Sequence, residues 1–260
     1  MILLPGYQIT EQLQEGANTI LFRGYREADN KSVIIKVPTQ EHPPFKVVAQ
    51  LKHEYEITNH LNFKGILIPY GLLINELITL LTFANFKGIF LDEYIKNNII
   101  HIKEFLTIAQ QLADILIELH KNKIIHKNIQ PKNILIAPET GQIKITEFSI
   151  ASLLSREYQT VSQPGLLEGS LDYMSPEQTG RMNRAIDYRT DFYSLGVTFY
   201  QMLTGRVPFQ ANDSMELVHC HIAKQPLPPH ELNPDIPLAV SSIVMKLLTK
   251  TAEDRYQSAR

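Results

Sequence analysis

The sequence predicts an α+β fold built from two lobes, a small antiparallel β-rich lobe over residues 1–84 and a larger helical lobe over residues 85–260. Two observations lead to this prediction. Runs of β-branched and aromatic residues separated by polar turns fill the first third of the chain, as is typical of strands. After about residue 90, the apolar residues recur at helical spacing instead. The short stretch "FANFKG" connects the two patterns.

Five segments of the first third are expected to form strands. They are rich in residues that suit a pleated sheet, and turn sequences such as "EADNK" lie between them. A segment with helical character, residues 47–61, interrupts the otherwise antiparallel sheet. The expected strands span residues 6–13, 19–27, 32–38, 66–74 and 77–83.

Three long helices are expected in the second lobe. Residues 103–122 carry a helical stripe of apolar side chains, which predicts one buried face. Residues 191–205 are apolar on most sides, which indicates a helix in the middle of the lobe. Gly205 is a suitable C-cap for that helix, and Pro208 prevents its continuation. Residues 238–250 form the third helix.

Composition narrows the class of protein. With 44% apolar and 20% charged residues the chain is typical of a globular protein, and a net charge of −2 argues against nonspecific nucleic-acid binding. No apolar run is long enough to cross a bilayer, so no membrane segment is expected. A single cysteine, Cys220, excludes an intrachain disulfide and suits a reducing cytoplasm. Its setting, "HCHIAK", permits a metal-ligand interpretation, but a half-buried thiol on an amphipathic segment is the preferred one.

A series of short motifs then carries the functional argument. "LQEGANTILFRG" lies on a strand–turn–strand, and "VIIK" ends the third strand at Lys36. "HKNIQPKN" follows a long amphipathic helix, and "ITEFS" follows the next short strand; "YMSPE", "DFYSLG" and "EDRYQSA" complete the series. In this order, from Tyr7 nearly to Arg260, the motifs resemble those of the eukaryotic-type protein kinase family, including its bacterial Ser/Thr kinases. The resemblance implies the bilobal kinase fold.

One stretch resembles a narrower group. "SPEQTGRMNRAIDYRTDFYSLGVTFYQMLTGRVPF" is similar to the kinase domain that heads large cyanobacterial signalling proteins, which continue into an ATPase module, a GAF domain and a histidine kinase. The resemblance implies that this chain is a piece of a longer polypeptide with further signalling domains after it.

The resemblance implies that ATP and Mg²⁺ bind between the lobes. Lys36 matches the lysine that contacts the α- and β-phosphates, and Glu54 matches the carboxylate that holds this lysine. Glu56, two residues further on, is the rival for that role, but its side chain should point in a different direction on the helix. The residues that match the adenine-contacting positions are Leu21, Ile34 and Leu135, and Phe83 is the candidate residue at the back of the site.

The loop that would cover the phosphates departs from the family pattern. Gln14, Gly16 and Thr19 stand where the family has three glycines, so only Gly16 is retained. A β-branched residue such as Thr19 disfavours positive φ, and side chains at two of the three positions limit the approach of the backbone to phosphates. We therefore expect weakened nucleotide binding.

Two amides occupy positions where the family uses charged groups. Asn128 stands at the position of the catalytic aspartate, and an amide cannot hold a proton at neutral pH. Because a general base typically contributes ~10²–10⁴-fold, this change should raise the barrier by about 3–5 kcal/mol. Gln130 replaces the lysine that offsets charge on the transferring phosphate, which a neutral amide cannot do.

The expected metal ligands are Asn133, which is retained, and Glu147, which replaces the metal-binding aspartate. The longer side chain of Glu147 displaces the carboxylate by roughly a bond length, while Mg²⁺ requires near-octahedral geometry at ~2.0–2.1 Å. Ser149 stands at the position of the usual glycine.

The scaffold positions of the family are retained. Glu177 and Arg255 match an ion pair in the lower lobe, and Asp191 matches the acid that holds the backbone of the loop around Asn128. His126 matches a histidine whose ring packs beneath the metal-binding loop.

The segment Ile150–Leu171 contains several hydroxyl groups, and in the family this loop can be phosphorylated. An ordinary polar loop is the preferred interpretation, because Lys127 stands where the family has the arginine that would bind a phosphate bidentately. The hydroxyl residues are Ser152, Ser155, Tyr158, Thr160, Ser162 and Ser170.

Two functional hypotheses follow. In the first, the domain is a pseudokinase that transfers little or no phosphate, because Asn128, Gln130 and Glu147 replace catalytic groups. In the second, it is a slow serine/threonine protein kinase in which Asn133 and Glu147 hold Mg²⁺ and a loose transition state tolerates Asn128.

Overall fold

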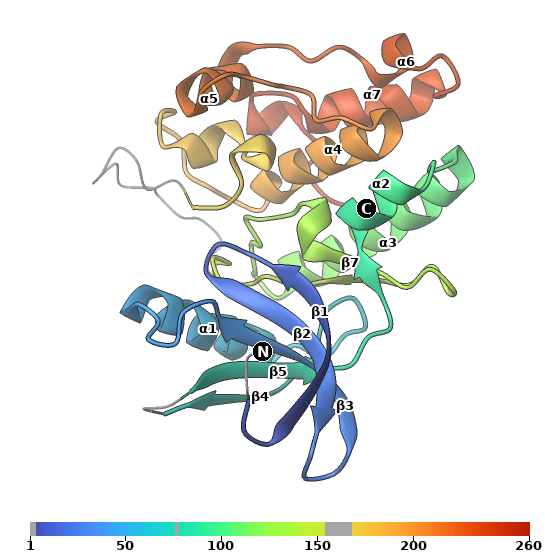
Figure 1. The fold of residues 1–260 in the computed structure, drawn as a ribbon. Coiled ribbons are helices and arrows are strands. Elements are labelled where there is room, and N and C mark those ends of the chain that lie inside the picture. The colour runs from blue at the N-terminus through green and yellow to red at the C-terminus, as the bar shows by residue number, and fades with distance from the viewer. Residues whose placement is uncertain (1–3, 76–77, 154–167) are drawn as a thin grey trace.

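A computed structural model describes residues 4–75, 78–153 and 168–260. The described residues form a lobe with a twisted β-sheet and a larger lobe made mainly of helices (Figure 1). This arrangement confirms the predicted α+β fold class and the bilobal kinase-like architecture.

The sheet lobe is built from five antiparallel strands in the order β1-β2-β3-β5-β4. Side chains alternate between the two faces of β3 and join two apolar clusters. Ile34 belongs to the cluster that reaches Leu135 in the other lobe, whereas Ile35 packs with residues on the other side of the sheet, and both are fully buried. Helix α1 (Phe45–Thr58) packs against β4 and β5. The strands are β1 (Tyr7–Glu15), β2 (Thr19–Arg26), β3 (Lys31–Pro38), β4 (Pro69–Ile74) and β5 (Thr79–Ala84).

A second, three-stranded sheet lies where the chain passes into the helical lobe. Its strands are β6 (Ile89–Phe90), β7 (Ile134–Ile136) and β8 (Ile143–Ile145), in the order β6-β7-β8. The sequence predicted a short strand before "ITEFS", which matches β8, but not β6, β7 or their pairing, because strands of two or three residues are too short to show a period-2 pattern.

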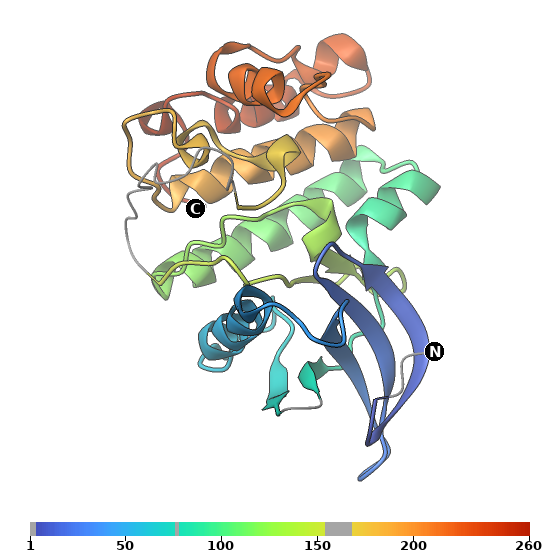
Figure 2. The same ribbon diagram turned by 60° about the vertical axis from the view of Figure 1, so that its left-hand side comes forward.

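The helical lobe is centred on α4 (Arg189–Thr204), which lies between α3 (Ile102–Lys121) and α7 (Leu238–Leu247). Figure 2 shows α4 in orange between the green α3 and the red C-terminal helices. Helix α4 is buried along almost its whole length and ends at Gly205 in the left-handed conformation, as predicted. The other elements are α2 (Leu91–Asn97), α5 (Ser214–Ala223), α6 (Pro229–Leu232) and the 3₁₀ turns η1 (Pro131–Asn133), η2 (Leu171–Tyr173), η3 (Pro176–Thr179) and η4 (Ala252–Asp254).

Cys220 lies on α5 and is only 5% exposed, so the expectation of a half-buried thiol was wrong. The helix turns this side chain into the protein together with His221, whereas His219 is exposed. Among the residues that the structure describes, no group of three or more His, Cys, Asp or Glu side chains is arranged to hold a metal ion.

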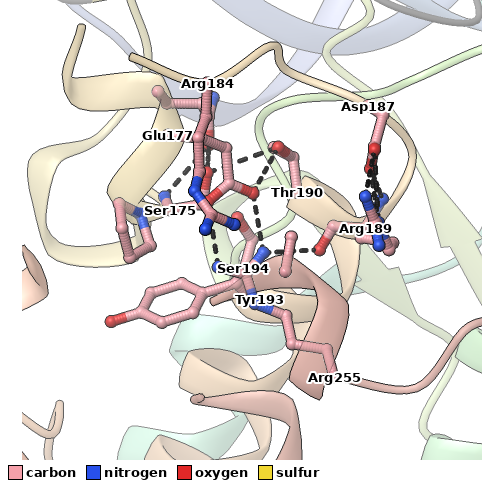
Figure 3. A network of polar contacts seen from close by, with 12 residues as sticks. Ser175, Glu177, Arg184, Asp187, Arg189, Thr190, Tyr193, Ser194 and Arg255 are labelled. Carbon is pink, nitrogen blue, oxygen red and sulfur yellow. Dashed lines mark hydrogen bonds and ion pairs between the residues drawn. The ribbon is translucent and has the colours of Figure 1, made fainter. Parts of the chain in front are cut away.

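A buried ion pair joins η3 to the end of the chain (Figure 3). Arg255 donates from Nη1 to Glu177 Oε1 at 2.6 Å and from Nη2 to Oε2 at 2.9 Å. The hydroxyl of Thr190 also donates to Oε1, at 2.8 Å. The predicted pair of Glu177 and Arg255 is thus confirmed, and its two-point geometry is the strong form of an arginine–carboxylate contact.

We expect Arg255→Ala to lower the free energy of unfolding by about 3–5 kcal/mol, because Glu177 would remain buried without its cation. Arg184→Ala is the matched control, since Arg184 pairs with Glu253 at the surface and its loss should cost less than about 1 kcal/mol. Urea denaturation of both variants measures the difference. Equal losses would contradict a special role for the buried pair.

Candidate functional site

A cavity of about 490 Å³ lies between the two lobes. Its walls come from the turn between β1 and β2, from α1, from the loop that leads into η1, and from the residues that follow β8. The cavity therefore brings together segments that are far apart in the sequence, including the loop around Asn128 and the "EFS" segment.

Lys36, at the cleft side of β3, lies between two carboxylates. Its Nζ is 2.6 Å from Glu54 Oε2 and also forms an ion pair with Glu147. Lys36 and Glu54 are 1% and 0% exposed. Burial alone would lower the pKa of Lys36, but the two carboxylates more than offset this and raise it above its ordinary value, so the ammonium stays charged.

Glu54 connects α1 to both the sheet and the "EFS" segment. While Oε2 binds Lys36, Oε1 accepts a hydrogen bond of 3.1 Å from the backbone N–H of Phe148. The rival Glu56 is 58% exposed and pairs with Lys52 on the outer face of the helix, 3.8 Å away. The structure thus brings Glu54, and not Glu56, to Lys36.

Glu147 has a backbone φ of 68°, in the left-handed region that non-glycine residues seldom adopt. Such a conformation costs roughly 1–3 kcal/mol and persists only where the surroundings hold it. Here the ion pair to Lys36 and the contact between Phe148 and Glu54 hold the residues on this turn. The carboxylate expected to bind a metal is therefore engaged with a lysine.

The loop that carries Asn128 is held from below by Asp191. One carboxylate oxygen accepts from the backbone N–H of His126 at 3.0 Å and the other from that of Lys127 at 2.8 Å, as predicted for this acid. Lys127 has a φ of 63°, and these hydrogen bonds support that turn.

The His126 ring fixes the same loop from within the core. It packs edge-on against Phe148 with ring centroids 4.6 Å apart, which agrees with its predicted position beneath the "EFS" segment. Burial lowers the pKa of His126, so the ring is neutral. Its Nε2 lies 3.0 Å from the carbonyl oxygen of Thr146 and must donate, while Nδ1 accepts from the backbone N–H of Asn128 at 3.2 Å.

The two amides expected at catalytic positions, Asn128 and Gln130, bind each other. Gln130 donates from Nε2 to Asn128 Oδ1 at 2.8 Å, and both residues line the cavity. Asn133 donates from Nδ2 to the backbone carbonyl of Asn128, also at 2.8 Å. An incoming hydroxyl at this position would meet an amide oxygen that already accepts a hydrogen bond and that cannot take a proton.

The turn between β1 and β2 closes over the cavity. Gly16 donates from its backbone N–H to Thr19 O at 2.8 Å. Gln14 donates from Nε2 to the carbonyl of Lys132 at 3.0 Å, which links the sheet lobe to η1 in the other lobe. This link was not foreseen, because nothing in the local sequence around Gln14 points to a partner more than a hundred residues away.

The residues expected around an adenine base are packed together. Leu21, Ile34 and Leu135 belong to one apolar cluster and are 2%, 0% and 0% exposed. Phe83, expected at the back of the site, belongs to the same cluster and is paired with Ile34 across β3 and β5.

Gln178 is a further positioning residue that sequence analysis missed. Its Nε2 donates to the carbonyl of Lys127 at 2.8 Å, and its Oε1 accepts from the backbone and hydroxyl of Ser175. The signal was present, since Ser175 and Gln178 form the Ser-x-x-Gln pattern of a capping box at the start of η3.

Two of the hydroxyl residues of the Ile150–Leu171 segment lie in the described part of the chain. Ser152 is buried and pairs with Ile125 through two backbone hydrogen bonds, and Ser170 precedes η2. Ser155, Tyr158, Thr160 and Ser162 lie outside the described residues.

No helix within the described ranges combines the length and apolar character needed to span a membrane.

The model of the protein kinase domain family matches residues 7–259. The chain therefore belongs to the protein kinase family, and the resemblance to its eukaryotic-type members is confirmed.

Two of three similar proteins are named serine/threonine-protein kinases, and the third is named a hybrid histidine kinase. A probable serine/threonine-protein kinase of Clostridium acetobutylicum is 30% identical over 260 residues, covering 99% of this chain and 39% of that protein. The serine/threonine-protein kinase PrkC of Bacillus subtilis is 31% identical over 213 residues, 82% of this chain and 32% of PrkC. The hybrid signal transduction histidine kinase G of Dictyostelium discoideum is 33% identical over 227 residues, 62% of this chain and 7% of that protein. The chain thus spans less than two fifths of the length of these relatives.

We expect Lys36→Met to lower the free energy of unfolding by about 3–5 kcal/mol near neutral pH, because two carboxylates would face each other without a cation. Burial already raises the pKa of Glu54, and loss of the ammonium raises it further. A carboxyl whose folded pKa exceeds its unfolded value loses stability as the pH rises through the folded pKa. The deficit should therefore shrink toward pH of about 4.

Urea denaturation of variant and parent at several pH values measures this deficit. Lys52→Met on the exposed face of α1 is the control, and should change stability by less than about 1 kcal/mol at each pH. A loss of stability in Lys36→Met that does not vary with pH would contradict this prediction, because it would show that Glu54 does not carry an unpaired charge in the variant.

Proposed function

We propose that the chain is a pseudokinase, a protein kinase-like signalling domain whose cleft binds ATP and Mg²⁺ weakly and transfers little or no phosphate. One observation carries the proposal. The groups that face the reaction position, Asn128 and Gln130, are neutral amides hydrogen-bonded to each other at 2.8 Å. A protein kinase needs a proton acceptor and positive charge there, because it works mainly by positioning and charge stabilisation.

The charged groups of the cleft support the same conclusion. Lys36 is shared between Glu54 and Glu147, so its charge is balanced before any phosphate arrives. A phosphate must displace Glu147 to gain the full attraction of the ammonium. We therefore expect this cleft to bind a nucleotide less strongly than a kinase cleft in which a single carboxylate holds the lysine.

Asn133 and Glu147 are the residues that would hold Mg²⁺. Both line the cavity and offer oxygen atoms, the donors that this ion prefers, so their chemistry fits the metal. Bound Mg²⁺ would neutralise charge on the phosphates. Glu147 has to leave Lys36 in order to serve as such a ligand, which weakens the site.

A slow serine/threonine protein kinase is the second candidate. The observation in its favour is the assembled scaffold, in which Lys36 pairs with Glu54 and Asp191 holds the loop before Asn128. The kinase relatives agree with this candidate as well. On this alternative, the scaffold positions ATP and the substrate hydroxyl well enough for slow phosphate transfer in spite of the amides Asn128 and Gln130.

The cellular setting is proposed on similar grounds. The lone Cys220 suits the reducing cytoplasm, and further signalling domains would follow in the same polypeptide. The Dictyostelium relative, a hybrid histidine kinase of which the matched part is 7%, supports such a context. The domain would then act through partner domains or proteins whose identity its own cleft does not define.

Transfer of radiolabelled phosphate from ATP to a generic protein substrate tests the proposal. We expect the triple variant Asn128→Asp, Gln130→Lys, Glu147→Asp to transfer phosphate at least about 10²-fold faster than the parent, because it regains a base and a cation. Lys36→Met in the triple background is the control and should abolish the gain. A parent that matches the triple variant, and that loses its activity on Lys36→Met, would establish the slow kinase instead.

A further inference from the structure

The end of the cleft next to the connector (residues 85–88) is filled by the protein's own side chains. Leu21 from β2, Ile34 from β3 and Leu135 from β7 are 2%, 0% and 0% exposed, although they come from opposite walls of the cleft. Phe83 and Phe86 belong to the same cluster and are 1% and 8% exposed. The expectation that a purine base would bind at this end of the cleft rests on the proposed function.

The open part of the cleft lies elsewhere. The 490 Å³ cavity reaches Leu21, but Ile34, Leu135 and Phe83 are not among the described residues that line it. Its walls are rich in amides, and of its two lysines Lys36 is already paired while Lys132 is exposed. The amide residues are Gln14, Asn18, Gln50, Asn128, Gln130 and Asn133. The space that remains is therefore lined mainly by polar side chains, with a few apolar ones from β2 and α1.

Ile34 is the side chain that completes the closure. It stands opposite Phe83 in the register of β3 and β5, and its branched side chain is in contact with no solvent. Protein interiors are packed densely enough that a planar base cannot enter unless such side chains move. The smaller side chain of alanine at this position would leave a space several methyl groups in size.

The connector is fastened in a way that keeps this end closed. Arg23 on β2 donates from Nη2 to the carbonyl oxygens of Phe86 and Gly88 at 3.3 and 2.9 Å. Its Nη1 forms an ion pair with Glu11 on β1. The Phe86 ring lies close over Gly88, where an added Cβ would be only 2.6 Å from Phe86 Cε1. Opening the base end therefore requires movement of a connector that is bound to the sheet.

We propose that the cleft discriminates against the purine base and that Ile34 is the deciding residue. The ligand of the cleft is then a polyphosphate, either free or carried by a nucleoside whose base adds no affinity. The phosphates would reach the polar cavity, and the base would remain outside the apolar cluster. This property is separate from the chemistry at Asn128, since one concerns binding of the base and the other transfer of phosphate.

Calorimetric binding of Mg²⁺-ATP, adenosine and Mg²⁺-tripolyphosphate to the folded chain tests the proposal. For the parent, the Kd values of ATP and tripolyphosphate should agree within about threefold and adenosine should not bind, whereas a parent that binds neither polyphosphate overturns the proposal. Ile34→Ala should strengthen ATP binding at least about tenfold and leave tripolyphosphate unchanged, because only the base gains a site.

Ile35→Ala is the matched control, as Ile35 is equally buried on the same strand but faces the other cluster, and it should change neither ligand. A parent that binds ATP tenfold more tightly than tripolyphosphate overturns the proposal, and so does a folded Ile34→Ala variant without a gain. If Ile34→Ala does not fold, the comparison of ligands on the parent decides. ATP bound weakly, yet tenfold more tightly than tripolyphosphate, would overturn this inference alone, whereas phosphate transfer by the parent would overturn the proposed function.

Discussion

Lys36 is held between the carboxylates of Glu54 and Glu147, and this contact fixes the geometry of the whole cleft. The contact between Lys36 and Glu54 attaches α1 to the sheet. The second carboxylate oxygen of Glu54 accepts a hydrogen bond from the backbone N–H of Phe148 and so positions that backbone. Through Glu147, Lys36 reaches the segment that follows β8. Because both Lys36 and Glu54 are almost fully buried, neither charge can be left without a partner at low cost. The two lobes therefore meet through an ionic contact in which one ammonium serves two carboxylates.

The helical lobe depends on polar contacts of the same kind, but these serve its architecture. Asp191 holds the backbone of the loop before Asn128, and Glu177 binds Arg255 at two points. In the cleft, by contrast, the charge of Lys36 is bound by Glu54 and Glu147, while Asn128 and Gln130 are neutral amides bound to each other. The proposed pseudokinase function requires that the fold keep its buried ion pairs while the cleft loses phosphoryl transfer, which is possible because stability and phosphoryl transfer depend largely on different residues.

Much of the fold was predictable from the sequence, because long periodic segments such as residues 103–122 and the series of strands show their type clearly. The motif order also placed Lys36, Glu54 and Asp191 in segments that the structure brings together. Strands β6 and β7 of the second sheet escaped prediction, as did the buried position of Cys220. The link from Gln14 to Lys132, the attachment of the connector by Arg23 and the engagement of Glu147 by Lys36 depend on tertiary contacts between distant segments, which no local pattern encodes.

Nuclear magnetic resonance of the side-chain ammonium of Lys36, assigned by its loss in Lys36→Arg, tests most directly whether the charges of the cleft are committed to one another. Burial and two carboxylate partners should protect its ammonium protons from exchange with water and make their signal observable. The account predicts that the parent without nucleotide shows couplings across the hydrogen bonds to both Glu54 and Glu147, because one ammonium serves two carboxylates. A Lys36 ammonium that exchanges freely with water, or that couples to Glu54 alone while nucleotide is absent, would contradict it.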